Sequence, residues 1–204
     1  MDSHTRLQSI GCVLRVALII AGLYLSGCAP LATSTTKPPP RLIVDASVAG
    51  DFKVLAQETW QQFLDVFHAR ADCFGDVTLH AVTALNSRAA YDPPTAIVTV
   101  RVPGTRAMLQ SALIHEWAHH IEFQCPAQQE LRPAFLAAQG LPTDTLWRPD
   151  NTPANTPESE WATIPSEQYA EATIEVVLGR RPIPTTARVT TEAVRVIAQW
   201  AAGR

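Results

Sequence analysis

Hydrophobic residues recur along this chain in two patterns, one typical of helices and one typical of strands. Apolar positions three and four residues apart predict an amphipathic helix over Asp51–Arg70 and another over Ala187–Ala201. Runs rich in β-branched residues predict short strands over Arg41–Ala46, Asp76–Leu85 and Ala96–Val102. A small sheet followed mainly by helices is an α+β arrangement, which is the fold class we expect for one compact domain.

The second half of the chain is predicted to be helical around one long loop. Helices are predicted over Arg106–Phe123, Gln129–Ala138 and Ser166–Leu178. Thr105 is suited to cap the first of these helices, and Gly179 to end the last. Residues 139–165 are rich in Pro, Thr and Asn, and loops of that length are usually functional or mobile. The tryptophans of this loop, Trp147 and Trp161, are predicted to pack rather than to line a cleft.

The apolar helix over Arg106–Phe123 carries the most informative motif, because His115, Glu116 and His119 form H-E-x-x-H. Helical residues four apart share one face, so the two imidazoles can bind a single Zn²⁺ ion. Glu116 stands beside them and can act as a base on a water that the metal activates. His120 projects about 100° away from this face, so we expect it to pack or to lie at the surface.

A catalytic zinc ion usually takes three protein ligands and one water molecule. No histidine follows His120 in the chain, so the third ligand should be a carboxylate from a later segment. Glu167 and Glu171 stand four residues apart on the helix predicted over Ser166–Leu178. Either carboxylate could bind the metal while the other accepts a hydrogen bond from a ligand histidine.

H-E-x-x-H followed some tens of residues later by E-x-x-A-E resembles the gluzincin metallopeptidases. The pattern is most similar to the anthrax lethal factor type of catalytic domain and its minimal zincin relatives. The resemblance implies a zincin-like fold, with a small sheet packed on the motif helix, and zinc as the cofactor. It implies His115, His119 and Glu167 as metal ligands. It also implies Glu116 as the general base and Glu171 as the residue that supports a ligand histidine.

The first 27 residues have the features of a bacterial lipoprotein signal peptide. Arg6 and Arg15 precede the apolar run Val16–Leu25, which is too short to span a bilayer securely. The run leads into Leu-Ser-Gly directly before Cys28, and this resembles the bacterial lipobox. The resemblance implies cleavage before Cys28 and lipid on that cysteine. It therefore predicts a protein anchored to the cell membrane on its extracytoplasmic side.

Residues 28–40 are rich in Pro and Thr and predict a tether, which leaves residues 41–204 for a single domain. A formal net charge of −3 provides no basic surface for nucleic acid, so we expect no nucleic-acid partner. Cys73 and Cys125 lie within the domain, and a pair of cysteines in an exported protein predicts a disulfide. Closing the long loop between them would stabilise the fold by roughly 4 kcal/mol.

The strand predicted over Ala96–Val102 immediately precedes the motif helix. As the edge of a sheet, this strand could hold an extended peptide by strand addition. As a central strand it would have no free edge. The sequence leaves both arrangements open.

Together these features predict a membrane-anchored zinc peptidase that acts on a peptide or protein at the cell envelope. One alternative is a surface lipoprotein that binds a partner and has a structural or vestigial zinc site. Another is a tethered regulator without metal, which requires Glu167 and Glu171 to point away from the histidines. A cleft over the motif with Glu116 facing it favours the enzyme, whereas a capped site with four protein ligands favours the binding protein.

Overall fold

The computed structural model describes residues 37–149 and 156–204. The predicted signal peptide, the lipidation site at Cys28 and most of the tether lie outside these residues. One compact unit covers Lys37–Arg204, and Pro40 is buried in it, where its carbonyl accepts a hydrogen bond from Trp60 Nε1. Within the described ranges, no helix combines the length and the apolar character needed to cross a membrane.

The described residues form six α-helices, a short 3₁₀ helix and a four-stranded mixed sheet, which confirms the predicted α+β class. The elements in chain order are β1 (Leu42–Val44), α1 (Gly50–Val66), η1 (His68–Arg70), β2 (Val77–Val82), β3 (Ala89–Asp92), β4 (Ile97–Arg101), α2 (Arg106–Gln124), α3 (Gln128–Gln139), α4 (Glu158–Trp161), α5 (Pro165–Leu178) and α6 (Thr191–Ala201). The helices mostly follow the sheet in the chain, as the hydrophobic pattern indicates.

The sheet has the strand order β1-β2-β4-β3. Strands β1, β2 and β4 run parallel, and β3 pairs antiparallel with β4. The strand predicted over Ala96–Val102 is therefore central, and the edge beside it is β3. This edge strand has only four residues, two of them alanine, and the hydrophobic pattern did not predict it.

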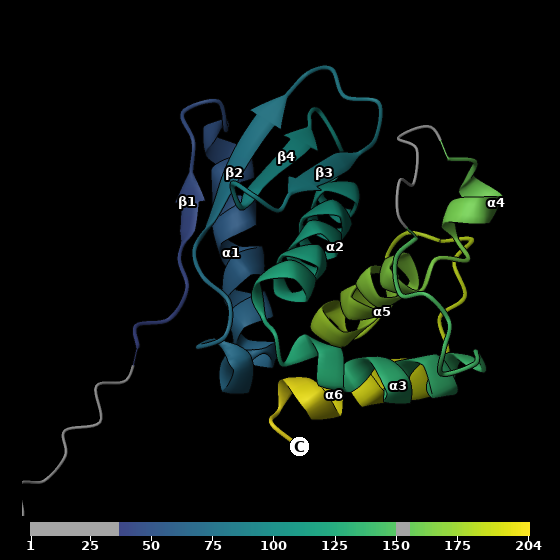
Figure 1. Cartoon of the computed structure of the whole chain (residues 1–204). Coiled ribbons are helices and arrows are strands. Elements are labelled where there is room, and N and C mark those ends of the chain that lie inside the picture. The colour runs from purple at the N-terminus through teal and green to yellow at the C-terminus, as the bar shows by residue number, and fades with distance from the viewer. Residues whose placement is uncertain (1–36, 150–155) are drawn as a thin grey trace, which may run out of the picture. The chain divides into compact units, whose positions relative to one another are not determined.

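Helix α2 lies between the sheet and α5, as Figure 1 shows. One side of α2 is held by an aromatic cluster, in which Trp117 is fully buried. The Trp117 ring centroid is 4.9 Å from that of Trp60 and 5.6 Å from that of Phe63, both on α1. Edge-to-face contacts of this kind add to the free energy of apolar burial. The aromatic cluster therefore fixes how α2 is rotated about its axis.

Both ends of α2 are tied to the rest of the fold. The Thr105 hydroxyl accepts a hydrogen bond of 3.3 Å from Met108 N, so the predicted helix cap is confirmed. Cys125 follows the last turn of α2 and forms the predicted disulfide with Cys73. The far end of α5 is also as predicted, because Gly179 ends it with a left-handed φ of 71°.

The long loop contains more structure than its composition indicated. The short helix α4 lies within the segment predicted as loop. Trp147 is buried against Phe135 and Tyr169, so the packing prediction is right for Trp147. The same prediction is wrong for Trp161, whose ring lines a cavity and stacks on His115 at 5.8 Å between centroids.

Candidate metal centre and active site

The two motif histidines project from the side of α2 that faces α5. Because the Trp117 side of the helix is buried in the aromatic cluster, residues one turn apart on the opposite side are directed away from α1. The rings of His115 and His119 lie edge to face with their centroids 4.8 Å apart. His120 points elsewhere, as expected, and is fully buried with Nε2 2.9 Å from the Gly75 carbonyl.

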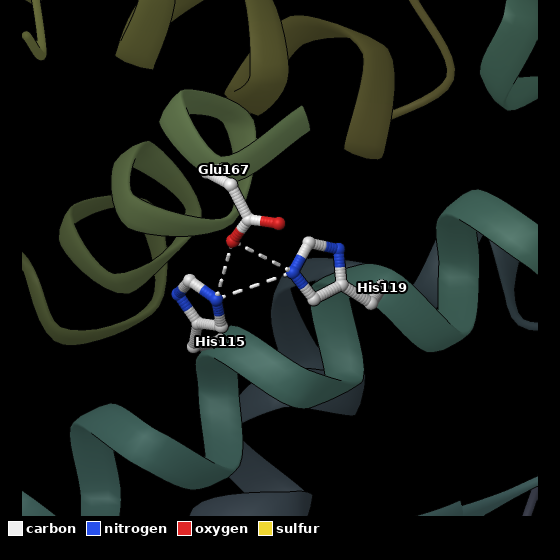
Figure 2. A group of neighbouring side chains, drawn as sticks. All are labelled: His115, His119 and Glu167. Atoms are coloured by element: carbon white, nitrogen blue, oxygen red, sulfur yellow. Dashed lines mark hydrogen bonds and ion pairs between the residues drawn. The ribbon is translucent and has the colours of Figure 1, made fainter. Parts of the chain in front are cut away.

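Glu167, in the first turn of α5, brings a carboxylate oxygen between the two imidazoles (Figure 2). Its Oε2 lies 3.1 Å from His115 Nε2 and 3.3 Å from His119 Nε2. The two Nε2 atoms are 3.2 Å apart. Donor atoms bound tetrahedrally to zinc at about 2.0–2.1 Å stand about 3.3 Å from one another. The triangle of donor atoms therefore has the dimensions expected for three ligands of a tetrahedrally bound metal ion.

A second layer of carboxylates holds the imidazole rings. His115 Nδ1 lies 2.9 Å from Glu171 Oε1, and His119 Nδ1 lies 2.9 Å from Glu122 Oε2. Since a carboxylate accepts these hydrogen bonds, the proton belongs on Nδ1 of each ring, and the lone pair on Nε2 is directed at the central position. The structure thus places Glu171 where the resemblance expected it. Glu122 was missed by the sequence analysis, although its position three residues after His119 is a usable signal.

Two arginines support these carboxylates. Arg148, from the segment between α3 and α4, donates from Nη1 to Glu167 Oε1 at 3.1 Å and from Nε to Glu122 Oε1 at 3.3 Å. Arg148 Nη2 also lies 3.0 Å from His119 Nδ1, but a protonated Nδ1 cannot accept, so we assign this guanidinium to the carboxylates. Arg181 forms an ion pair with Glu171 and donates to its backbone carbonyl at 2.7 Å. No sequence signal identified either arginine.

With neutral imidazoles, the charges of the described residues around the donor triangle do not balance. Four buried carboxylates surround it: those of Glu116, Glu122, Glu167 and Glu171. Among the described residues, Arg148 and Arg181 are the arginines that form ion pairs with them, which leaves two negative charges when the imidazoles are neutral. Buried charges without partners are costly. A divalent cation at the centre of the triangle would balance the remaining charge.

The shifted pKa values of the donor groups also indicate that the donor triangle favours positive charge. Burial would lower the pKa of His115, but its hydrogen bonds to Glu167 and Glu171 outweigh burial and raise the pKa to about 10. The pKa of His119 is raised for the same reason, against the effect of burial, mainly by Glu167 and Glu122. Burial would raise the pKa of Glu167, but the two imidazoles lower it well below its ordinary range. The site therefore attracts protons strongly, and a metal ion competes for the same lone pairs.

Glu116 faces a cavity that contains the donor triangle. This cavity has a volume of about 750 Å³, and His115, Glu116, His119 and Glu167 are among the residues that line it. The Glu116 carboxylate has no hydrogen bond or ion pair with another described residue, and Glu116 is only 7% exposed. Burial raises its pKa above the ordinary value, although the two histidines oppose this. A carboxylate with a raised pKa that faces a cavity is well suited to accept a proton near neutral pH.

No protein-family model, no curated protein and no solved structure matches this chain. The similarity to gluzincins accordingly stays a prediction that depends on two short motifs. The predicted lipid anchor falls outside the described residues, so its role also stays a prediction.

Proposed function

We propose that the protein is a zinc-dependent peptidase, with His115, His119 and Glu167 as the metal ligands. The observation that carries the proposal is the triangle of donor atoms, with sides of 3.1, 3.2 and 3.3 Å, in the wall of a cavity that Glu116 also lines. Among the described residues, this is the one group of side chains placed to hold a metal ion, and it has three members. Three ligands leave a coordination position for water, which is the arrangement of catalytic zinc sites.

The residues present suit zinc in ligand type, distance and charge. Two neutral imidazoles and one carboxylate form a common catalytic ligand set, and the remaining charge of −2 matches a divalent ion. When bound, zinc would supply a Lewis acid that polarises a carbonyl group and lowers the pKa of water toward 7. Glu171 and Glu122 would hold the ligand imidazoles in the required tautomer.

Glu116 would carry the proton in the reaction. Its carboxylate would accept a proton from the water that attacks the peptide carbonyl, and would then deliver that proton to the leaving amine. Burial raises the pKa of this carboxylate, which makes it a stronger base than an exposed glutamate. The absence of a competing hydrogen bond from a described residue leaves the carboxylate oxygens accessible to water and substrate.

The edge strand β3 supports a peptide as the substrate. Ala89 and Tyr91 on this strand line the same cavity as the donor triangle. Strand β3 pairs with β4 on one side only, so its other edge has no strand partner among the described residues. An extended peptide could pair with that edge and pass over the metal position. If the predicted lipid anchor is present, the substrates would be peptides or proteins at the cell envelope.

The alternative of a binding protein has less support from the site. A structural zinc site is closed by four protein ligands, whereas the donor group in the described ranges has three. The alternative of a regulator without metal requires Glu167 and Glu171 to point away from the histidines. Both carboxylates instead lie within 3.3 Å of an imidazole nitrogen.

Metal analysis with a cleavage assay tests the proposal. We expect one zinc ion per chain in the purified protein, very little in His119→Ala, and parental content in the control His80→Ala, which changes a partly exposed histidine outside the site. Cleavage of an unfolded test protein should stop when a chelator removes the metal and resume when Zn²⁺ is added. Equal zinc content in the parent and His119→Ala would contradict the proposed metal site. Cleavage that persists without metal would contradict the proposed mechanism.

A further inference from the structure

The cavity is lined by a third arginine, Arg88, whose surroundings differ from those of the other two. Arg148 and Arg181 each contact carboxylates of the candidate metal centre. The side chain of Arg88 has no hydrogen bond or ion pair with any of the described residues, although it is partly buried. A guanidinium that is partly buried in a cavity, without a protein partner, is a ready binding group for an anion.

The position of Arg88 is fixed by the sheet and by a glycine. Arg88 directly precedes β3, and its carbonyl accepts a hydrogen bond of 2.9 Å from Arg101 N. Its Nη1 lies 3.5 Å from the point that a Cβ atom on Gly104 would occupy, and Leu109 Cδ2 lies 3.0 Å from the same point. The guanidinium therefore lies at the level of the first turn of α2, where Gly104 leaves room for it.

This arrangement sets a lower limit on the separation between Arg88 and the metal position. Leu109 and His115 are six residues apart on α2, which corresponds to about 9 Å along the helix axis. An extended peptide advances about 3.3 Å per residue. A group bound by Arg88 would thus belong to a residue at least three positions from the bond that lies at the metal.

The charges in the rest of the cavity favour a carboxylate as the group that Arg88 binds. At the metal end, the carboxylates would be balanced by two arginines and the cation. Glu158, which also lines the cavity, is exposed, and its Oε1 accepts a hydrogen bond of 3.0 Å from Thr186. Between the two ends, Met108 and Ala112 contribute apolar surface to the lining. Among the described arginines that line the cavity, Arg88 is therefore the one available to a ligand, and a guanidinium binds a carboxylate with two parallel hydrogen bonds.

We propose that Arg88 selects peptide substrates that carry a carboxylate three or more residues from the bond to be cleaved. The carboxylate is supplied by an Asp or Glu side chain or by the C-terminus of the substrate. This inference rests on the proposed peptidase function, because it assumes that the peptide lies across the donor triangle. It adds a substrate class that the metal site alone does not indicate.

Peptide binding to the zinc-loaded full chain with Glu116→Gln tests the proposal, because this variant should hold peptides without cleaving them. The probes are N-acetylated, C-amidated octapeptides of Ala and Leu in which a single Glu is moved through every position. A matched set has Gln in place of Glu, and a third set has Gln with a free C-terminal carboxylate. Calorimetry should show binding roughly tenfold tighter or better for one carboxylate position than for its amide counterpart. The set that shows the gain identifies the source of the carboxylate.

Adding Arg88→Gln should abolish this preference, and Arg88→Lys should retain part of it, because lysine keeps the charge without the paired hydrogen bonds. The control Arg195→Gln changes an exposed arginine on α6 and should leave the preference intact. Zinc content verifies that each variant is folded. Equal binding of all three peptide sets, no measurable binding of any set, or a preference that survives Arg88→Gln would overturn the proposal. The binding readout needs no turnover, so its failure can be separated from a failure of peptidase activity.

Discussion

The two sides of helix α2 are both buried, yet they are stabilised in different ways. The side with Trp117 packs against aromatic rings of α1, and these contacts stabilise it without any bound ion. The side with His115 and His119 is covered by carboxylates and arginines, and among the described residues its charges balance only when the imidazoles are protonated or a cation is added. Burial therefore has opposite consequences on the two sides. It lowers the free energy of the fold on the apolar side, and on the polar side it makes the carboxylates require positive charge, from imidazole protons or from a cation.

The largest effect is expected on the polar side, from Glu116→Gln. The amide cannot accept the proton, so the cleavage rate should fall by roughly 10²- to 10⁴-fold. Zinc content and melting temperature should stay close to parental values, because Glu116 is not among the three ligands. Measuring the cleavage rate and the zinc content of the same preparation would show that cleavage is lost while the metal is kept. A variant that cleaves as fast as the parent would refute the role of Glu116 as base.

On the apolar side, Trp117→Ala should destabilise the fold by about 3–5 kcal/mol, because it removes a fully buried indole from the aromatic cluster. The loss should appear in denaturant unfolding of the protein after chelation, so that metal binding does not contribute. Any molecules that stay folded should still bind zinc in a one-to-one ratio. Unchanged stability would show that the apolar side of α2 is not what anchors the helix.

The second layer on the polar side is probed by Glu122→Gln, with Glu171→Gln as its matched partner. Each variant weakens the hydrogen bond that orients one ligand imidazole, and we expect metal affinity to fall by roughly 10- to 100-fold. Competition with a chromogenic chelator measures this affinity. If Glu122→Gln binds zinc as tightly as the parent, Glu122 does not orient His119 in the way that its contact indicates.

The smallest effect that we expect near neutral pH is a change in the stability of the chelated protein. The loss of stability grows toward both extremes of pH. The pKa of His115 is raised from 6.5 to about 10, so its contribution is complete below pH 6.5 and is lost as pH rises through about 10. The pKa values of Glu122, Glu167 and Glu171 are lowered, so their contributions are present above about pH 4.5 and are lost as pH falls. Melting temperatures measured from pH 3 to pH 11 should therefore fall on both sides. His115→Ala should remove most of the alkaline decline.

The elements that could be predicted are those whose signal lies within a short stretch of chain. Helix α2 with its Thr105 cap, the Gly179 end of α5 and the strand around Ala96–Val102 all follow from local periodicity and turn chemistry. The edge strand β3 could not be found in this way, because its stability comes from pairing with β4 rather than from its own residues. The prediction that Trp161 packs away from a cleft failed for a similar reason, since its surroundings come from a distant helix.

The sequence by itself determined that two imidazoles lie on one face of a helix with a glutamate beside them. It also determined that two more carboxylates follow on a later helix. It left open which of Glu167 and Glu171 approaches the metal position. Only the packing of α5 on α2 decided that Glu167 lies between the Nε2 atoms and Glu171 behind His115. The contacts of Arg148 and Arg181, and the place of Arg88 in the cavity, also arise only when distant segments meet. Helix periodicity fixes neighbours within a few residues, whereas the partners of a long charged side chain depend on the complete tertiary fold.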